Sequence, residues 1–241
     1  MKKTAIILAA GKGKRMNSST KKQYMELLGK PVLYYSVKAF EDSVVDEIII
    51  VCSFDDREYI EREIVRKYGF KKVSFIVGGG KERYNSVMNG LNAIGSTDYV
   101  FIHDGVRPLV TPEIINKAYD TAVVHKSAVV GMPVKDTIKI VDNSNNVMET
   151  PNRNNVWLVQ TPQVFAYSPI TDAYEDLIAS ETSLTNRGIK ITDDAMVLET
   201  FGSIPIKLVE GSYENIKITT PDDMTYAESI LIARNNYSKK G

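Results

Sequence analysis

A glycine- and lysine-rich segment, LAAGKGKRM at residues 8–16, is the strongest local sign of chemistry in the sequence. Gly11 and Gly13 allow the backbone to approach a ligand closely, and successive N–H groups in such a loop can bind an anion. From the N-terminus to Met25 the chain has seven basic residues and no acidic one. This excess of positive charge beside glycines indicates a site for a phosphate-bearing ligand.

The spacing within this loop excludes two familiar phosphate-binding motifs. The dinucleotide fingerprint requires a third glycine where this chain has Met16, and an acidic residue near Cys52 at the end of the second β-prone run. The P-loop requires Ser or Thr after its Gly-Lys pair, whereas here Arg15 follows. In isolation the loop would be interpreted as a glycine turn with solvated lysines, so the prediction of phosphate binding depends on the other clusters of the sequence.

Two further clusters, GGGKERYNSVMNGL at residues 78–91 and HDGVRP at 103–108, also follow β-prone runs. Ligands of open α/β sheets bind beyond the carboxyl ends of the strands, so we expect the three clusters to converge. Asp104, at the tip of an apolar run, suits a Mg²⁺ ion that also contacts phosphate oxygens, and a turn or helix cap is the alternative. We expect His103 to be a packed strand residue rather than a base.

The rarity of histidine and cysteine restricts the chemistry further. With two histidines and one cysteine, the sequence disfavours zinc chemistry and Cys-His catalysis, and no serine lies in a nucleophile-elbow motif. Transfer to a phosphate acceptor needs none of these groups, because a phosphate is already an ionised nucleophile at neutral pH. Cys52 lies in the apolar run EIIIVCS, which predicts a buried free thiol and fits a reducing, cytoplasmic compartment.

The composition and the order of the elements indicate one α/β domain spanning residues 1–241. The chain is 43% hydrophobic and 25% charged, as in soluble globular proteins. Its zero formal net charge argues against nucleic-acid binding, and no apolar run is long enough to span a membrane. Helical spacing alternates with β-prone runs, which predicts a mostly parallel twisted sheet flanked by helices. These runs are residues 5–10, 47–53, 73–77, 99–103 and 128–134.

Residues 135–160 interrupt this alternation. Two β-prone runs flank the turn-forming cluster DNSNN at 142–146, which predicts a β-hairpin arm that projects from the sheet. Such an excursion often has a binding role, and a merely decorative insertion is the alternative. Elsewhere we expect helices at 112–125, 169–187 and 193–200, strands at 206–209 and 216–219, and a closing helix from Pro221.

Taken together, the motifs resemble those of the 2-C-methyl-D-erythritol 4-phosphate cytidylyltransferase family. That family joins CTP to a phosphorylated sugar alcohol and releases pyrophosphate in the non-mevalonate isoprenoid pathway. The resemblance covers nearly the whole chain and implies a Rossmann-like nucleotidyltransferase fold. The matching segments are AAGKGKRM, KKQY, GGGKERYNSV, HDGVRP, PVKDT, NRNNVW, QTPQVF, TDDA and VEGSYENIKITTPDD.

The resemblance also implies roles for individual residues. Arg15 and Lys22 match the pair that stabilises the pentavalent transition state, and Asp104 matches the Mg²⁺ ligand. The positions that match the nucleotide site are Ala9, Ala10, Gly11, Gly13, Gly80 and Ser86. The positions that match the acceptor site are Arg107, Thr137, Thr161, Arg153 and Lys217, the last two orienting the acceptor phosphate for attack.

In the resembling family the arm crosses to a partner subunit and completes its active site, so a homodimer is expected.

Two departures of this sequence from the family pattern concern substrate specificity. Lys81 stands where many relatives have an acidic residue, and Asn152 precedes Arg153 where the family more often has aspartate. Trp157 and the TDDA motif at 192–195 favour methylerythritol phosphate as the acceptor.

The expected function is therefore a Mg²⁺-dependent cytidylyltransferase acting on CTP and methylerythritol phosphate. The first alternative is the same chemistry on ribitol 5-phosphate, whose enzymes share the first loops. The second is a nucleotide-binding regulator without turnover, which would not require Arg15, Lys22, Asp104 and Lys217 together. A glycosyltransferase is disfavoured because the sequence has no Asp-x-Asp motif.

Overall fold

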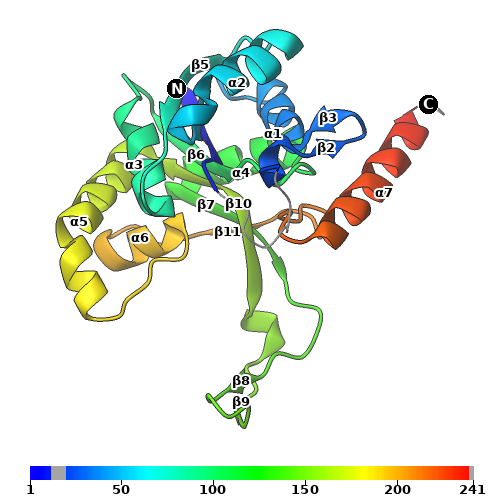
Figure 1. Cartoon of the computed structure of the whole chain (residues 1–241). Helices are drawn as coiled ribbons and strands as arrows, with labels where there is room; N and C mark the ends of the chain where they lie inside the picture. Colours follow the sequence, from blue (N-terminus) through cyan, green and yellow to red (C-terminus); the bar gives the residue numbers. More distant parts are fainter. Residues whose placement is uncertain (12–19, 239–241) are drawn as a thin grey trace.

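The computed structural model is built around a seven-stranded sheet with the strand order β11-β7-β10-β6-β1-β4-β5 (Figure 1). It describes residues 1–11 and 20–238. Four strand pairs, β1–β4, β1–β6, β4–β5 and β7–β11, are parallel, which confirms the mostly parallel α/β sheet. The strands are β1 (Lys3–Ala9), β4 (Glu47–Cys52), β5 (Val73–Gly78), β6 (Tyr99–Asp104), β7 (Ser127–Pro133), β10 (Trp157–Ala166) and β11 (Leu208–Glu210).

Strand β10 runs antiparallel to both of its neighbours, β6 and β7. It follows the arm directly, and a return without a crossover helix makes a strand antiparallel to the one before it. We expected residues 157–160 in the arm, and this boundary is wrong: Trp157 and Val159 pair with Pro133 and Gly131 of β7. The arm ends before Trp157, and β10 carries the chain back into the sheet.

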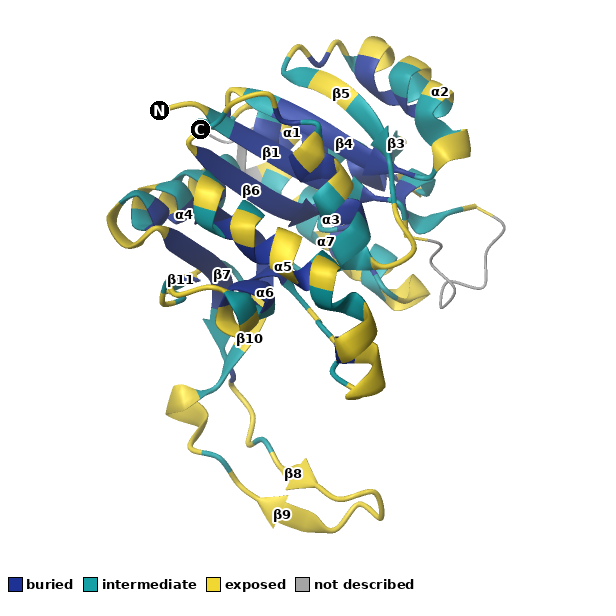
Figure 2. Ribbon diagram, turned by 90° about the vertical axis from the view of Figure 1, so that its left-hand side faces the viewer, coloured by how far each residue is buried: buried dark blue, intermediate teal, exposed yellow. Residues whose placement is uncertain are grey.

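The long apolar runs of the sequence reflect a sheet that is covered on both faces (Figure 2). Alternate residues of β1 point to opposite sides, so Ala5 and Ile7 belong to one core and Ile6 to the other, all fully buried. No helix in the described residues is long and apolar enough to cross a membrane. Elements packing on the first face are α1 (Val32–Glu41), α2 (Arg57–Tyr59), η4 (Ile60–Arg66) and α4 (Pro112–His125), and those on the second are α3 (Arg83–Asn92), α5 (Tyr167–Asn186) and α6 (Asp194–Phe201).

Helix α4 shows why some boundaries were predictable. Thr111 caps it by accepting a hydrogen bond from the Ile114 N–H, and Pro112 occupies the first turn, where its missing N–H costs nothing. The helix ends at Lys126, which adopts a left-handed conformation with φ of 69°. These local signals place the observed helix at the expected residues 112–125.

The predicted strand at 216–219 is wrong. This segment pairs with no strand of the described structure, and its N–H groups bond to different elements. Ile218 donates to the carbonyl of Val106, and Thr219 donates to Asp223 at the start of α7 (Pro221–Ser238). The β-prone pattern reflects burial instead, because Ile218 is fully buried in a small core between α7 and Val106.

Residues 134–156 form the arm, which projects away from the sheet (Figures 1 and 2). Its tip is a hairpin of β8 (Ile140–Val141) and β9 (Val147–Glu149), followed by the short helix η5 (Arg153–Asn155). The carboxylate of Asp142 accepts hydrogen bonds from the N–H groups of Ser144 and Asn146 and so closes the predicted turn. The remaining elements are η2 (Lys22–Tyr24), β2 (Glu26–Leu27), β3 (Lys30–Pro31) and η3 (Phe54–Asp56).

Candidate active site

Two pockets open beside the carboxyl ends of β1 and β6 and share one charged wall. The first has a volume of about 550 Å³ and the second about 580 Å³. Arg83, Asp104 and Lys217 line both. The first is otherwise lined by Leu8, Ala9, Ala10, Gly11, Lys22, Gln23, Gly80, Lys81, Glu82, Ser86 and Val106. The three clusters expected to converge therefore do meet, at the first pocket.

Asp104 is the centre of the shared wall. Its carboxylate lies 2.8 Å from Lys217 Nζ, 3.5 Å from Arg83 Nε and 3.9 Å from Arg107 Nε. Burial by itself would raise the pKa of Asp104, but the three cations outweigh it and hold that pKa well below its usual range. The carboxylate is therefore ionised at neutral pH, in a site whose net charge remains positive and suits phosphate.

Arg83 is a site residue that the sequence analysis missed. Its guanidinium makes a two-pronged ion pair with the fully buried Asp194, with both N–O distances 2.7 Å. The hydroxyl of Tyr174 donates to the same carboxylate at 2.6 Å. Arg83 opens α3 and Asp194 opens α6, 111 residues later, so no local spacing in the sequence could signal the pair. The pair fixes the cation that lies between the two pockets.

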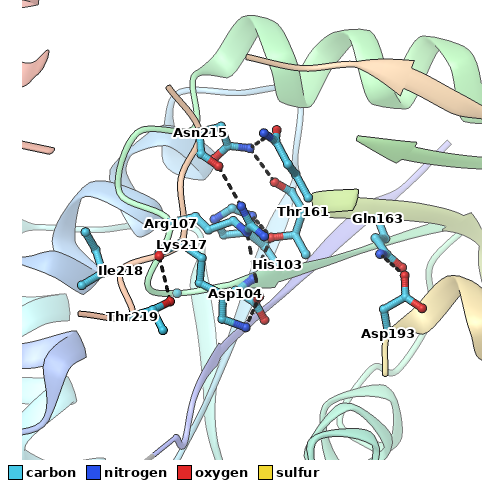
Figure 3. A network of polar contacts seen from close by, with 12 residues as sticks. His103, Asp104, Arg107, Thr161, Gln163, Asp193, Asn215, Lys217, Ile218 and Thr219 are labelled. Atoms are coloured by element: carbon cyan, nitrogen blue, oxygen red, sulfur yellow. Dashed lines mark hydrogen bonds and ion pairs between the residues drawn. The ribbon is translucent and has the colours of Figure 1, made fainter. Parts of the chain in front are cut away.

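The segment before α7 delivers further groups to the site (Figure 3). Lys217 reaches Asp104, and the carbonyl of Ile218 accepts a hydrogen bond from Lys22 Nζ at 2.9 Å. The carbonyl of Asn215 accepts a hydrogen bond from Arg107 Nη1 at 2.7 Å. The structure thus brings Lys22, Arg107, Lys217 and Asp104 together, as expected from the sequence. It also shows what orders the three cations.

The two glycine loops pack against each other at the first pocket. A Cβ at Gly79 would lie 2.6 Å from the Cβ of Ala10, so a larger residue would separate the loops. Gly80 N–H donates to Ser86 Oγ at 3.0 Å, which fixes the second loop. The side-chain amide of Gln23 donates to the carbonyls of Ala9 and Gly11. Of the expected nucleotide residues, Gly13 lies outside the described residues, as does the expected catalytic Arg15.

Thr161 and His103 support Asp104 from behind. Thr161 Oγ1 accepts a hydrogen bond from the Asp104 N–H at 3.1 Å and lies 3.0 Å from His103 Nδ1. Burial lowers the pKa of His103 to about 3, so the ring is neutral and packed, as predicted. Burial also raises the pKa of the Cys52 thiol to about 11, consistent with an inert buried residue. Thr161 lines the second pocket, but its hydroxyl is engaged in holding Asp104.

Thr137 and Arg153 lie on the arm, both exposed, and line neither pocket of their own chain. Within the described part of the chain, Arg153 Nη1 donates to the Lys135 carbonyl, at 3.3 Å. A single chain therefore does not bring these two predicted acceptor residues to the other site residues.

The residues around Asp104 bear on metal binding. Among the described residues, no three His, Cys, Asp or Glu side chains form a cage for a metal ion. A Mg²⁺ ion usually takes only one or two carboxylates and completes its shell with phosphate oxygens and water. A single ionised carboxylate between two pockets, one of them lined by the glycine loops, fits that donor set.

Comparison with known sequences gives a consistent result across the chain. A model of the 2-C-methyl-D-erythritol 4-phosphate cytidylyltransferase family matches residues 3–233. The enzyme of that name from Lachnoclostridium phytofermentans is 51% identical, covering 95% of this chain and 96% of its own. The one from Lachnospira eligens is 49% identical, covering 95% and 98%.

Solved structures show the same similarity. The crystal structure of 4-diphosphocytidyl-2C-methyl-D-erythritol synthase from Anaerococcus prevotii superposes with a TM-score of 0.82 at 36% identity, covering 95% of this chain and 96% of that one. The 2-C-methyl-D-erythritol 4-phosphate cytidylyltransferase of Francisella tularensis superposes with a TM-score of 0.75 at 32% identity, covering 94% and 98%.

Proposed function

The chain belongs to the 2-C-methyl-D-erythritol 4-phosphate cytidylyltransferase family, and we propose that its two pockets hold the two substrates of that reaction. The protein transfers CMP from CTP to 2-C-methyl-D-erythritol 4-phosphate and releases pyrophosphate, in isoprenoid synthesis. The relatives therefore favour the expected acceptor over ribitol 5-phosphate, and an enzyme over a regulator without turnover.

The observation that carries the proposal is the wall shared by the two pockets. The glycine loops line the first pocket, which we assign to CTP, and Arg107 lines the second, which we assign to the acceptor. Arg83 and Lys217 line both pockets and can contact both sets of phosphates. Two phosphate groups held against one cationic wall are placed for transfer between them.

The chemistry needs no general base. An acceptor phosphate oxygen attacks the α-phosphorus of CTP, and a new P–O bond forms. The bond from the α-phosphorus to the oxygen bridging to the β-phosphate breaks, and pyrophosphate leaves with its electron pair. The protein contributes alignment and stabilises negative charge on the transferring phosphoryl group.

We assign that stabilisation to Lys22 and Arg15. Lys22 lines the CTP pocket and is followed by Gln23, whose amide bonds to the carbonyls of Ala9 and Gly11. Arg107 and Lys217 hold the acceptor phosphate in this assignment. Lys217 Nζ donates a hydrogen bond to Asp104 in the structure. When the acceptor binds, Lys217 would donate a hydrogen bond to its phosphate as well as, or instead of, to the carboxylate.

Asp104 would hold a Mg²⁺ ion at the boundary of the pockets. When bound there, the ion supplies positive charge to CTP phosphate oxygens. The carboxylate suits this role because its low pKa keeps it ionised and because it lies at the strand end that faces both pockets.

We propose that the arm reaches a second copy of the chain and adds Thr137 and Arg153 to its acceptor pocket. Two features support a partner for the arm. It leaves apolar side chains exposed, Val147 at 58% and Met148 at 71%. Its arginine also lines neither pocket of its own chain.

Pyrophosphate release tests the assignment. The assay contains CTP and Mg²⁺, with methylerythritol 4-phosphate, ribitol 5-phosphate or no acceptor. We expect release with methylerythritol phosphate and little above the blank with ribitol phosphate. Equal or greater release with ribitol phosphate would show that the second pocket selects a different sugar alcohol.

A further inference from the structure

The segment of residues 212–219 holds three charged side chains of the site without being a strand or helix. The Asn215 carbonyl binds Arg107 Nη1, Lys217 Nζ binds Asp104, and the Ile218 carbonyl binds Lys22 Nζ. A strand would be fixed by a ladder of backbone bonds, whereas the place of this segment depends on a few individual contacts. The contacts that fix it therefore decide where the cations lie.

Asn215 provides the side-chain contacts that tie this segment to β10 (Figure 3). Its side chain is fully buried, and Nδ2 donates to the Thr161 carbonyl at 2.9 Å and to Gln160 Oε1 at 3.1 Å. Gln160 in turn donates to the carbonyl of Ser212, which closes the connection at the other end of the segment. The amide groups of Asn215 and Gln160 thus link β10 to the segment before α7.

We infer that Asn215 is a positioning residue for the acceptor phosphate, acting through Arg107 and Lys217. Its carbonyl fixes the Arg107 guanidinium directly, and its side chain sets the backbone from which Lys217 projects two residues later. The inference rests on the proposed function, which places both cations at the acceptor phosphate.

Two unpartnered atoms mark the same junction. Asn215 Oδ1 and Arg107 Nε are buried and have no hydrogen-bond partner among the described residues. Buried polar atoms are almost always paired, so these two show that the polar groups of this junction are not fully satisfied by the described residues. The requirement at position 215 is for a donor, because both atoms that face Nδ2 are acceptors.

Asn215→Asp is the sharpest variant because it keeps the shape but points an acceptor at the two acceptors. We expect the KM for methylerythritol phosphate to rise and kcat to fall, each by about ten- to hundredfold, as for a lost buried hydrogen bond. The KM for CTP should stay within about threefold, because the glycine loops that line the CTP pocket are untouched. Asn235→Asp adds the same charge at an exposed position of α7 and should match the wild type.

Folding and function are separated by two further measurements. Asn215→Ala adds no charge and should show the same split between the two KM values, which keeps the test valid if Asn215→Asp folds poorly. In a cycle with Arg107→Ala, the double variant should lose less than the product of the two single losses.

Three outcomes would overturn the inference. If both Asn215 variants lose thermal stability while the folded enzyme keeps its acceptor KM, Asn215 is only structural. If Arg107→Ala raises the acceptor KM but Asn215→Asp does not, the acceptor site stands and the positioning role falls. An Arg107→Ala enzyme with unchanged acceptor KM would instead refute the proposed acceptor pocket, and the inference with it.

Discussion

Lys22 lines the CTP pocket and, like Lys81, lies outside the wall that this pocket shares with the acceptor pocket. Its ammonium group donates a hydrogen bond to the backbone carbonyl of Ile218, which holds it at the pocket. A side chain that acts on the transition state affects the chemical step more than substrate binding. This separates its expected effect from that of the residues that hold the acceptor.

Lys22→Ala should reduce kcat by about 10² to 10³-fold while the dissociation constant for CTP changes by less than about tenfold. Steady-state pyrophosphate release and equilibrium CTP binding measure the two quantities. Lys71→Ala, which removes an exposed lysine remote from both pockets, is the matched control. Unchanged kcat in Lys22→Ala would remove it from the mechanism.

The proposed metal ligand makes a separate prediction. Chelation of divalent ions should abolish pyrophosphate release, and added Mg²⁺ should restore it. Asp104→Asn should raise the Mg²⁺ concentration for half-maximal turnover by at least about tenfold, because a neutral amide is a weaker ligand than an ionised carboxylate. Full activity in the presence of a chelator would contradict the assignment of Mg²⁺ to Asp104.

At the scale of elements, the contact between α3, α5 and α6 orders Arg83. Tyr174 on α5 donates to Asp194 on α6, which holds Arg83 on α3. Tyr174→Phe should lower the free energy of unfolding by about 2 kcal/mol, because it removes a buried hydrogen bond to a charged group. The melting temperature should fall by about 4 to 8 °C.

Turnover of Tyr174→Phe should stay within about threefold of the wild type, since Arg83 keeps both bonds to Asp194. Tyr226→Phe removes a hydroxyl from a side chain that is 49% exposed and should leave the melting temperature unchanged. Equal melting temperatures for all three proteins would show that the tyrosine hydroxyl does not stabilise this junction.

The same elements show how far sequence reasoning reaches. Helix α4 was predictable because Thr111 and Pro112 mark its start within four residues. Strand β6 was predictable because a strand covered on both faces needs a continuous apolar run. The placement of β10 between β6 and β7 was not, because strand order depends on distant partners.

Some residues of the site could likewise be predicted from the sequence, and others could not. Asp104 could be found because it ends an apolar strand and stands beside Arg107 in one motif. Arg83 could not, because its partner Asp194 is brought to it only by the packing of α3, α5 and α6. The segment at 216–219 has the composition of a strand, yet it pairs with no strand of the described structure, and the N–H groups of Ile218 and Thr219 bond to a loop carbonyl and a side chain.

At the scale of the whole molecule, the arm should control both assembly and acceptor binding. Replacing residues 138–151 with a short glycine linker should convert the proposed dimer to a monomer, measured by light scattering after size-exclusion chromatography. Turnover should fall by at least about 10²-fold because Arg153 would no longer reach a second copy. The chain without its arm should still bind CTP, since the first pocket contains no arm residue. A dimer of unchanged activity would show that the arm is not the contact.

The central claim is that the two pockets of one chain and the arm of another form a single active site. Co-expression of Lys22→Ala and Arg153→Ala chains with different tags allows the mixed dimer to be purified. Each homodimer should be nearly inactive, because every site lacks one of the two groups. The mixed dimer has one site that combines an intact Lys22 with an intact Arg153, so we predict about half of the wild-type turnover. A mixed dimer as inactive as its parents would contradict this account.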